Sequence, residues 1–147
     1  ADRALGGPSR RCAETADALG LRAAAEPALR SWDMGRWQGL RLDEVSAAEP
    51  EAVAAWLSDP QAAPHGGESL TALCERVGGW LDSLPGDAGR VLAVVEPAAV
   101  RAAVVHALAL PAAAFWRLDV EPLTLTELVG RSGRWNLRCG RPPGRAR

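Results

Sequence analysis

Two charged side chains stand where the chain is expected to turn into a helix. Arg11 lies in the first turn of a helix predicted over residues 9–19, and Glu96 follows the apolar run 91–95 and precedes another predicted helix. A helix N-terminus attracts anions, because its free N–H groups and the helix dipole supply positive potential. The carboxyl ends of parallel strands also border the ligand crevice of α/β sheets. We therefore expect Arg11 and Glu96 to face one cavity and to pair there, filling the space of an anion.

Each candidate residue also has a simpler interpretation. Arg11 is a phosphate ligand if the cavity is open and a solvated helix residue if it is not. Glu96 is favoured at a helix start by the helix dipole, and its alternative roles are a general base or a metal ligand. His65 follows Pro64 in a polar loop and is expected at the surface, with the cavity mouth as the alternative. His106 lies among small apolar residues and is expected to be a packed or partly exposed structural residue.

The cysteines indicate neither a metal centre nor a disulfide framework. Cys12, Cys74 and Cys139 form an odd, widely spaced set without a Cys-x-x-Cys pair or a histidine at ligand spacing. We therefore expect no metal and no other cofactor. Free thiols are typical of a reducing cytoplasm.

The composition is that of a globular domain. The chain has 147 residues, of which 48% are hydrophobic and 24% charged, far from the composition of disordered proteins. All 17 basic residues are arginine, but the net charge of −1 does not favour nucleic acid or an anionic membrane as a partner. No run of about 18 apolar residues and no signal-peptide pattern is present, so we expect a cytoplasmic protein.

Hydrophobic periodicity predicts an alternating α/β chain. Apolar residues recur at three- and four-residue spacing from Leu70 to Leu84, which predicts a helix over 68–84. The run 91–95 is β-branched and apolar on both faces, as in an inner parallel strand. Further helices are expected over 9–19, 98–109, 111–116 and, as two short helices divided at Pro50, over 43–56. Extended segments or strands are expected over 21–30, 117–120, 123–129 and 134–139. We place one domain at 1–139 and a disordered tail at 140–147.

Four segments, in order, resemble motifs of one enzyme family. PSRRCAETADALG (8–20) is similar to Ser-Pro-x-x-Arg-x-x-x-Thr-Ala, and LRSWDMGRWQG (29–39) is similar to Leu-x-Glu-x-x-x-Gly-x-Trp-x-Gly. PHGGES (64–69) resembles Pro-Gly-Gly-Glu-Ser, and VLAVVEPAAVR (91–101) resembles the turn Val-x-His-Gly-Gly-x-x-Arg. The closing segments FWRLDVEPLTLTEL and RWNL also match. The chain is thereby identified as a member of the histidine phosphatase (phosphoglycerate mutase-like) superfamily.

This resemblance implies a fold and a chemistry. The fold is a three-layer α/β structure with a mostly parallel sheet and helices on both faces. The chemistry is phosphoryl transfer through a histidine, whose cationic pocket holds the phosphoryl group while a glutamate protonates the leaving oxygen. The implied substrate is a phosphorylated small molecule. The family's Arg-His-Gly strand precedes the first motif and is not among residues 1–147, so we expect a sheet that lacks this strand.

Several family positions carry other residues. Arg11 keeps the position of a phosphate-binding arginine, but Ser31 occupies the position of the glutamate acid and cannot serve as a proton donor near neutral pH. Glu96 occupies the position of the second histidine, and Pro97 and Ala98 replace two glycines. A carboxylate there repels a phosphoryl group. We therefore predict a catalytically inactive pseudophosphatase in which the remnants of the phosphate or ligand site are Arg11, Ser31, Glu96 and His65.

Two alternatives stay open. The first is an active phosphatase or mutase, for example one like α-ribazole phosphatase, whose nucleophile precedes this segment; Arg11 supports it. The second is a structural protein that pairs through an open sheet edge with another copy of itself. The six tryptophans are expected mostly in core and loop packing; Trp32 and Trp37, on the loop that would rim the pocket, are the two candidates for ligand stacking. Glu68 and Ser69 are expected to act at the start of their helix.

Overall fold

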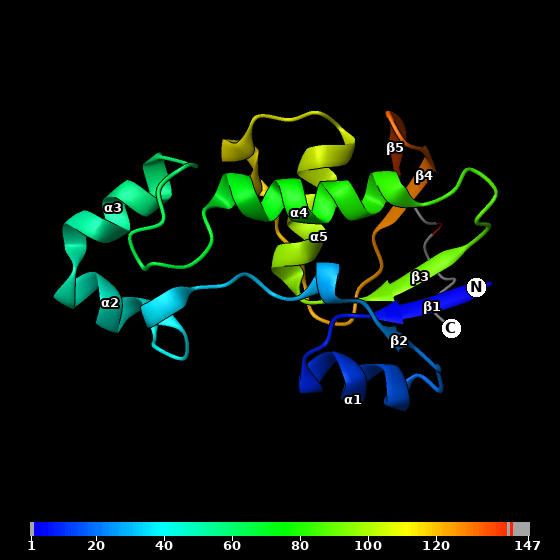
Figure 1. Ribbon diagram of the computed structural model, residues 1–147, viewed down its shortest axis with the longest axis horizontal. Helices are drawn as coiled ribbons and strands as arrows, with labels where there is room; N and C mark the ends of the chain where they lie inside the picture. The colour runs from blue at the N-terminus through cyan, green and yellow to red at the C-terminus, as the bar shows by residue number, and fades with distance from the viewer. Residues whose placement is uncertain (1, 141, 143–147) are drawn as a thin grey trace.

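The computed structural model describes residues 2–140 and 142 and centres on a small parallel sheet. Its strands are β1 (Arg3–Gly6), β2 (Ala24–Ala25) and β3 (Val91–Val94), in the order β2-β1-β3. Leu5 of β1 lies opposite Ala24 on one side and Ala93 on the other. Figure 1 shows this sheet between α1 (Arg10–Ala18) and the pair α4 (Leu70–Ser83) and α5 (Pro97–Ala107). The predicted α/β class with a parallel sheet is confirmed.

Two details of the predicted sheet are wrong. β3 is the outer strand, and the described residues place no strand along its free edge. The apolar pattern of residues 91–95 indicates that both faces of the strand are covered, in agreement with the half-burial of all four β3 residues. The pattern does not indicate whether both edges of the strand are paired. The inner strand is β1, which the sequence analysis did not predict. Its sequence RALG has no β-branched residue, so only its pairing reveals it.

The predicted helices are confirmed to within two residues. The hydroxyl of Ser9 accepts a hydrogen bond from the N–H of Cys12 and begins α1, and Gly20, with φ of +71°, follows its end. The hydroxyl of Ser69 caps α4 in the same way. The two short helices are α2 (Leu42–Ala48) and α3 (Pro50–Ser58). Proline at the first position of α3 fits because the N–H it lacks would have no helical partner.

The C-terminal strands differ from the prediction. After the short helix η3 (Ala112–Arg117), residues 118–126 form no strand, so the strand predicted over 117–120 is wrong. The strand predicted over 123–129 begins only at residue 127, because Leu123 has a φ of +57°, which a strand does not accommodate. β4 (Glu127–Arg131) and β5 (Arg134–Arg138) form a separate antiparallel hairpin. Within the extended segment predicted over 21–30, only β2 is a strand, followed by η1 (Pro27–Leu29).

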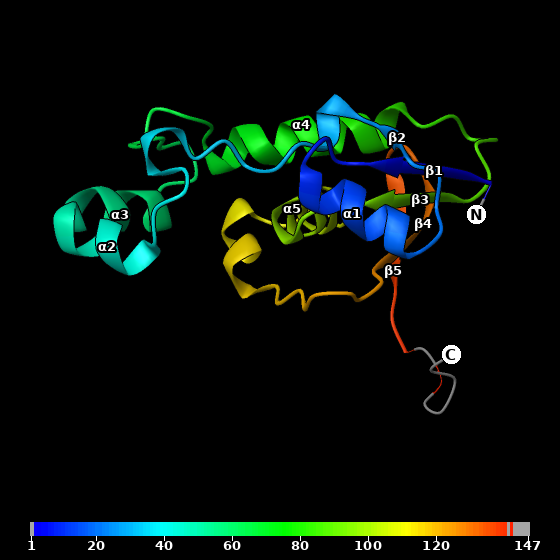
Figure 2. The ribbon, with the colours of Figure 1, turned by 90° about the horizontal axis from the view of Figure 1, so that it is seen from below.

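The helices α2 and α3 form an arm at one end of the molecule, away from the sheet, as Figures 1 and 2 both show. The short helix η2 (Gly35–Trp37) precedes this arm. The hydrophobic core runs from the arm to α4 and α5 and includes Trp37, Val53, Trp56, Leu73 and Phe115. No described helix is long and apolar enough to cross a bilayer. Residues 141 and 143–147 of the predicted tail lie outside the described residues.

Candidate anion site and the loop beside it

Arg11 and Glu96 form the ion pair that the sequence predicted. Arg11 lies in the first turn of α1, and Glu96 is the N-cap of α5, so both stand at helix starts that follow strands. Arg11 Nη1 and Glu96 Oε1 are 3.8 Å apart, and the side chains are 82% and 22% exposed. An ion pair this long and this open to water contributes little to stability. The ion pair matters because it places the carboxylate of Glu96 beside Arg11 at the start of α1.

The loop that carries Ser31 lies near the carboxyl ends of β1 and β3, where Arg11 and Glu96 also lie. Gly7 follows β1, and its N–H donates to the carbonyl of Val94 at the end of β3, 2.9 Å away. A Cβ added at Gly7 would stand 2.9 Å from the carbonyl oxygen of Leu29, so the loop passes close to the turn into α1. Ser31 follows two residues later and is half-buried. The structure therefore brings this loop to the sheet edge where the ion pair lies.

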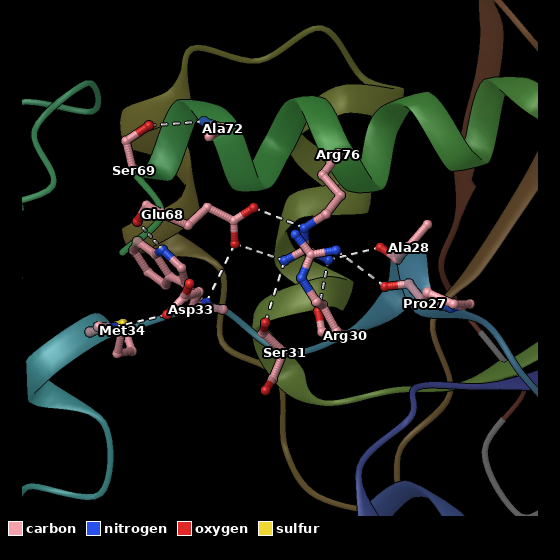
Figure 3. A network of polar contacts seen from close by, with 12 residues as sticks. Pro27, Ala28, Arg30, Ser31, Asp33, Met34, Glu68, Ser69, Ala72 and Arg76 are labelled. Carbon is pink, nitrogen blue, oxygen red and sulfur yellow. Dashed lines mark hydrogen bonds and ion pairs between the residues drawn. The ribbon is translucent and has the colours of Figure 1, made fainter. Parts of the chain in front are cut away.

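Arg76 of α4, which no sequence motif indicated, fixes the loop. Its Nη1 donates to the carbonyls of Ala28 and Arg30, both at 2.8 Å, and its Nη2 reaches the carbonyl of Ser31 at 3.4 Å. Its Nε and Nη2 also donate to the two carboxylate oxygens of Glu68, each at 2.8 Å. Figure 3 shows the guanidinium between Glu68 and the loop backbone. All five of its N–H groups therefore have an acceptor.

The position of Arg76 on its helix is the signal that could have identified it. Leu73 and Val77 are 0% and 1% exposed, so the helix turn that contains Arg76 faces the core. The side chains of Arg76 and Glu68 are themselves only 11% and 10% exposed. Burial acts to raise the pKa of Glu68, but the hydrogen bonds and the charge of Arg76 outweigh it and lower that pKa. Glu68 is therefore ionised at neutral pH.

The segment before α4 also holds the loop through its backbone. The carbonyl of Glu68 accepts from Trp32 Nε1 at 2.7 Å, and the N–H of Glu68 donates to the carbonyl of Asp33 at 2.8 Å. The predicted helix-start role is confirmed for Ser69, which is the N-cap of α4. The carboxylate of Glu68 instead serves Arg76. The two motif segments 29–39 and 64–69 are thus joined into one unit.

Glycine makes this junction close. A Cβ on Gly67 would stand 2.3 Å from the carbonyl oxygen of Asp33, and a Cβ on Gly35 would stand 2.2 Å from that of His65. Neither position has room for a side chain. The guanidinium of Arg36 ties the same junction to the arm, because it donates to the carbonyl of Pro64 and pairs with the carboxylate of Glu49.

His65 is not at the surface, so its predicted position is wrong. It is 1% exposed, its Nδ1 accepts from the N–H of Gly67 at 2.9 Å, and its ring meets Trp37 edge to face at 5.2 Å between centroids. Its Nε2 has no polar partner among the described residues. Burial lowers the pKa of His65, with a smaller contribution from Arg36 in the same direction and an opposing one from Asp33. A polar loop composition predicted exposure, but the aromatic core of the arm covers this residue.

Trp32 and Trp37 pack in the core, as was expected for most of the tryptophans, and the ligand-stacking role considered for these two is wrong. They are 8% and 3% exposed and lie in the core. Trp32 contacts Trp56 and Phe115 with ring centroids 5.3 and 5.4 Å apart, and Trp37 contacts Trp56 at 5.6 Å. The loop composition rich in Trp and Gly therefore indicated a core anchor rather than a ligand platform.

His106 has the structural role that was expected. Its Nε2 lies 2.7 Å from Asp82 Oδ2, and the other carboxylate oxygen of Asp82 accepts from Trp135 Nε1 at 3.3 Å. One carboxylate therefore joins α4, α5 and the hairpin. Burial acts to raise the pKa of Asp82, but the hydrogen bonds from His106 and Trp135 outweigh it and lower that pKa.

The three cysteines are free thiols. Cys12 is buried, Cys74 is half-buried and Cys139 is exposed. Burial raises the pKa of Cys74 to about 11, which leaves it protonated and unreactive at neutral pH. Among residues 2–140 and 142, no three His, Cys, Asp or Glu side chains gather in a group that could hold a metal ion.

Known proteins resemble this chain in sequence and in fold. A glucosyl-3-phosphoglycerate phosphatase of Mycolicibacterium vanbaalenii is 44% identical over 71 residues, which are 46% of this chain and 32% of that protein. Phosphoserine phosphatase 1 of Hydrogenobacter thermophilus is 33% identical over 72 residues, 48% of this chain and 34% of that protein. The matched segment thus spans about a third of these curated relatives.

Solved structures match over more of the chain. A mycobacterial glucosyl-3-phosphoglycerate phosphatase superposes with a TM-score of 0.73 at 28% identity, over 92% of this chain and 75% of the other. The complex of this phosphatase with inorganic phosphate gives a TM-score of 0.74 at 29% identity, over 93% and 75%. The model of the histidine phosphatase superfamily, branch 1, matches residues 1–140. The chain belongs to the histidine phosphatase superfamily, branch 1.

Proposed function

We propose that this chain is a non-catalytic member of its superfamily, a pseudophosphatase whose phosphoryl site is occupied from within by Glu96. The observation that carries the proposal is the ion pair between Arg11 and Glu96, at 3.8 Å between Nη1 and Oε1. The carboxylate lies where the family motif has a histidine. It satisfies the cation that would otherwise attract a phosphoryl group, and it repels the dianion itself.

The position of Ser31 supports the same function. Arg76 and Glu68 hold this loop by direct hydrogen bonds, Arg76 to its carbonyls and Glu68 to Trp32 and Asp33, so the loop keeps a defined course. The side chain that it presents is a hydroxyl, which cannot protonate a leaving oxygen near neutral pH. General acid catalysis contributes about 10²- to 10⁴-fold to such reactions, so its loss alone removes most of the activity. Ser31 and Glu96 both lie inside the chain, so their effects do not depend on what precedes Ala1.

The ligand that fits the remnant site is a phosphorylated small molecule. The related phosphatase has been solved with inorganic phosphate, and the curated relatives are named for phosphorylated small molecules. In this chain we expect Arg11 to be the only strong contact retained, with Ser31 and Glu96 beside it. His65 is removed from the proposed site, because its ring is buried against Trp37.

A phosphate titration tests the proposal. We expect the unmodified chain to bind inorganic phosphate or vanadate weakly or not at all in calorimetry, and Glu96→His to gain measurable affinity. Glu96→Gln, which removes the charge but adds no donor cation, should gain less. Glu14→Gln is the matched control, since Glu14 is an exposed acid on α1 that pairs with Arg10. Equal, tight binding by the unmodified chain and Glu96→His would show that Glu96 does not close the site.

Activity is the second candidate function, and Arg11 favours it. Its side chain is 82% exposed and free to turn toward a ligand. A phosphatase assay at pH 5 to 8 should include glucosyl-3-phosphoglycerate and phosphoserine, for which two relatives are named, and an aryl phosphate as a general substrate. Turnover comparable to that of active family members, abolished by Arg11→Ala, would establish a phosphatase and overturn the pseudophosphatase proposal.

The unpaired edge of β3 favours a third candidate, an assembly role. Within the described residues its outer edge has no partner strand, and an open edge is a template for another strand. Sedimentation velocity would show a dimer if two copies pair along this edge. The carbonyls of Arg90 and Val94 accept from β1, so the alternate residue Ala93 faces the free edge; Ala93→Pro removes its N–H donor there and should dissociate such a dimer. A purely monomeric chain at high concentration would exclude the role.

A further inference from the structure

The outward face of the hairpin carries two arginines in direct opposition. In the β4–β5 register, Arg131 is the partner of Arg134, and Val129 is the partner of Asn136. Cross-strand partners point to the same face, so these four side chains share one face of the hairpin. Trp135, on the alternate face, donates to Asp82 of α4. The arginine face is therefore the one turned away from that contact.

The two ends of the same face are charged differently. At the open end, Glu127 is the partner of Arg138, and their side chains form an ion pair with 3.6 Å between Oε1 and Nη1. At the turn end the partners are both arginine, and like charges directly opposite each other destabilise a hairpin. No carboxylate among the described residues forms an ion pair with Arg131 or Arg134.

A hollow of about 400 Å³ lies at this end of the hairpin. Its lining residues are Gly86, Val129, Gly130, Arg131, Arg134 and Asn136. Asn136 adds an amide donor to the two guanidinium groups, and the space beside Gly86 is open, since nothing lies within 4 Å of a Cβ placed there. The volume suits a small ligand rather than a single ion alone. Asp82 contacts the alternate face of the hairpin through Trp135, and its ion pair is with His106 rather than with either arginine.

From the opposed arginines and the hollow between them, we propose a second anion site on this hairpin, which binds the phosphoryl group of a small phosphorylated molecule through Arg131, Arg134 and Asn136. The planar forks of two guanidinium groups match the oxygens of one phosphoryl group, and an anion between them converts the repulsion into attraction. This site is separate from Arg11 and Glu96 and does not depend on the proposed function.

The test is a titration of the full 147-residue chain with inorganic phosphate, in which NMR records the backbone amide signals. Phosphate should shift the amide signals of residues 129–136, and chloride at matched ionic strength should not. The double variant Arg131→Gln, Arg134→Gln should bind phosphate at this site about tenfold more weakly or worse, as expected when charge-assisted bonds are lost. Arg138→Gln is the matched control on the same face, because its partner is Glu127; it should leave the affinity at residues 129–136 unchanged.

A charge reversal gives an independent readout. Arg134→Glu places an acid opposite Arg131, so it should raise the melting temperature without phosphate and abolish the phosphate-induced shifts. A titration with glycerol phosphate distinguishes a site for phosphate monoesters from a site for free phosphate. A hollow of this volume should bind the monoester at least as tightly as inorganic phosphate. Unchanged affinity in the double variant, or equal shifts with chloride, would overturn the proposal, whereas the outcome at Arg11 has no bearing on it.

Discussion

Arg76 and Glu68 form a doubly bonded ion pair in the interior, with 2.8 Å from Nε to Oε2 and 2.8 Å from Nη2 to Oε1. The remaining N–H groups of Arg76 bind three backbone carbonyls of the loop that precedes η2. The pair therefore links the start of α4 to the loop that carries Ser31. Its side chains are about nine-tenths buried, so it differs in kind from the surface pairs of this chain.

Removal of either partner should destabilise the fold strongly. Arg76→Met leaves the carboxylate of Glu68 buried without its cation, and Glu68→Gln leaves the guanidinium unpaired, each at a cost of about 3–5 kcal/mol in the free energy of unfolding. Urea unfolding measures this. Arg10→Gln is the control, since Arg10 and Glu14 form an exposed pair, and it should change little. Equal effects of Arg76→Met and Arg10→Gln would contradict the buried role.

His65 should make the fold sensitive to mild acid. Because burial lowers its pKa in the folded chain, the unfolded chain binds a proton more readily than the folded one. The stability that depends on neutral His65 is complete above the ordinary value of 6.5 and declines as the pH falls below it. His65→Asn keeps an acceptor for the N–H of Gly67 and removes the titration. The stability of the parent chain should therefore fall more steeply between pH 7 and 5 than that of His65→Asn; parallel curves would show that His65 does not titrate with unfolding.

The ionisation of Asp82 should determine how strongly the β4–β5 hairpin is held to α4 as the pH falls. Its pKa is lowered by the hydrogen bonds of His106 and Trp135 against an opposing effect of burial. The stability from its ionised form is therefore present above its ordinary value of 3.8 and is lost as the pH falls through the lowered pKa. Asp82→Asn should flatten this acid dependence and speed hydrogen exchange of the amides in β5 at neutral pH. Unchanged exchange in β5 would show that Asp82 does not hold the hairpin.

Two adjacent glycines of α4 should respond to alanine in opposite directions. A Cβ on Gly78 would stand 2.3 Å from the ring of His106, so Gly78→Ala must push α5 away and should cost about 1–3 kcal/mol. Gly79 is exposed and has nothing within 4 Å of such a Cβ, so Gly79→Ala should stabilise the helix by about 0.5–1 kcal/mol. Thermal unfolding of the two variants measures both signs. A common sign would contradict the close packing of α4 on α5.

The sequence was sufficient where one element carries its own pattern. The helices follow from caps such as Ser9 and Ser69 and from apolar spacing, which local residues determine. The sequence was insufficient where the structure of a segment depends on the strand that pairs with it. β1 is a strand because β2 and β3 flank it, and β3 is an edge strand although its residues are apolar on both faces. No local pattern contains that information.

The candidate site shows the same division. The pairing of Arg11 with Glu96 was predictable, because both follow strands of one parallel sheet and begin helices. The burial of His65 and Trp37 was not, because Trp37 packs on Trp56, a residue of α3 outside the motifs, and His65 packs on Trp37. Arg76 was missed because its partners in the loop are backbone carbonyls, which leave no trace in the residue types; the signal available was its place between the buried Leu73 and Val77.

The aromatic cluster gives this chain a built-in optical reporter. Trp32, Trp56 and Trp116 lie with ring centroids 4.9–5.9 Å apart, close enough for their excited states to couple. Trp135 stands apart on the hairpin, beside Asp82. Coupled circular dichroism bands should therefore follow the arm and its core, while the emission of Trp135 follows the hairpin. A Trp56→Phe variant would remove two of the three tryptophan–tryptophan contacts and weaken the first signal, and a Trp135→Phe variant would remove the second, so one unlabelled chain can reveal whether its two ends open together.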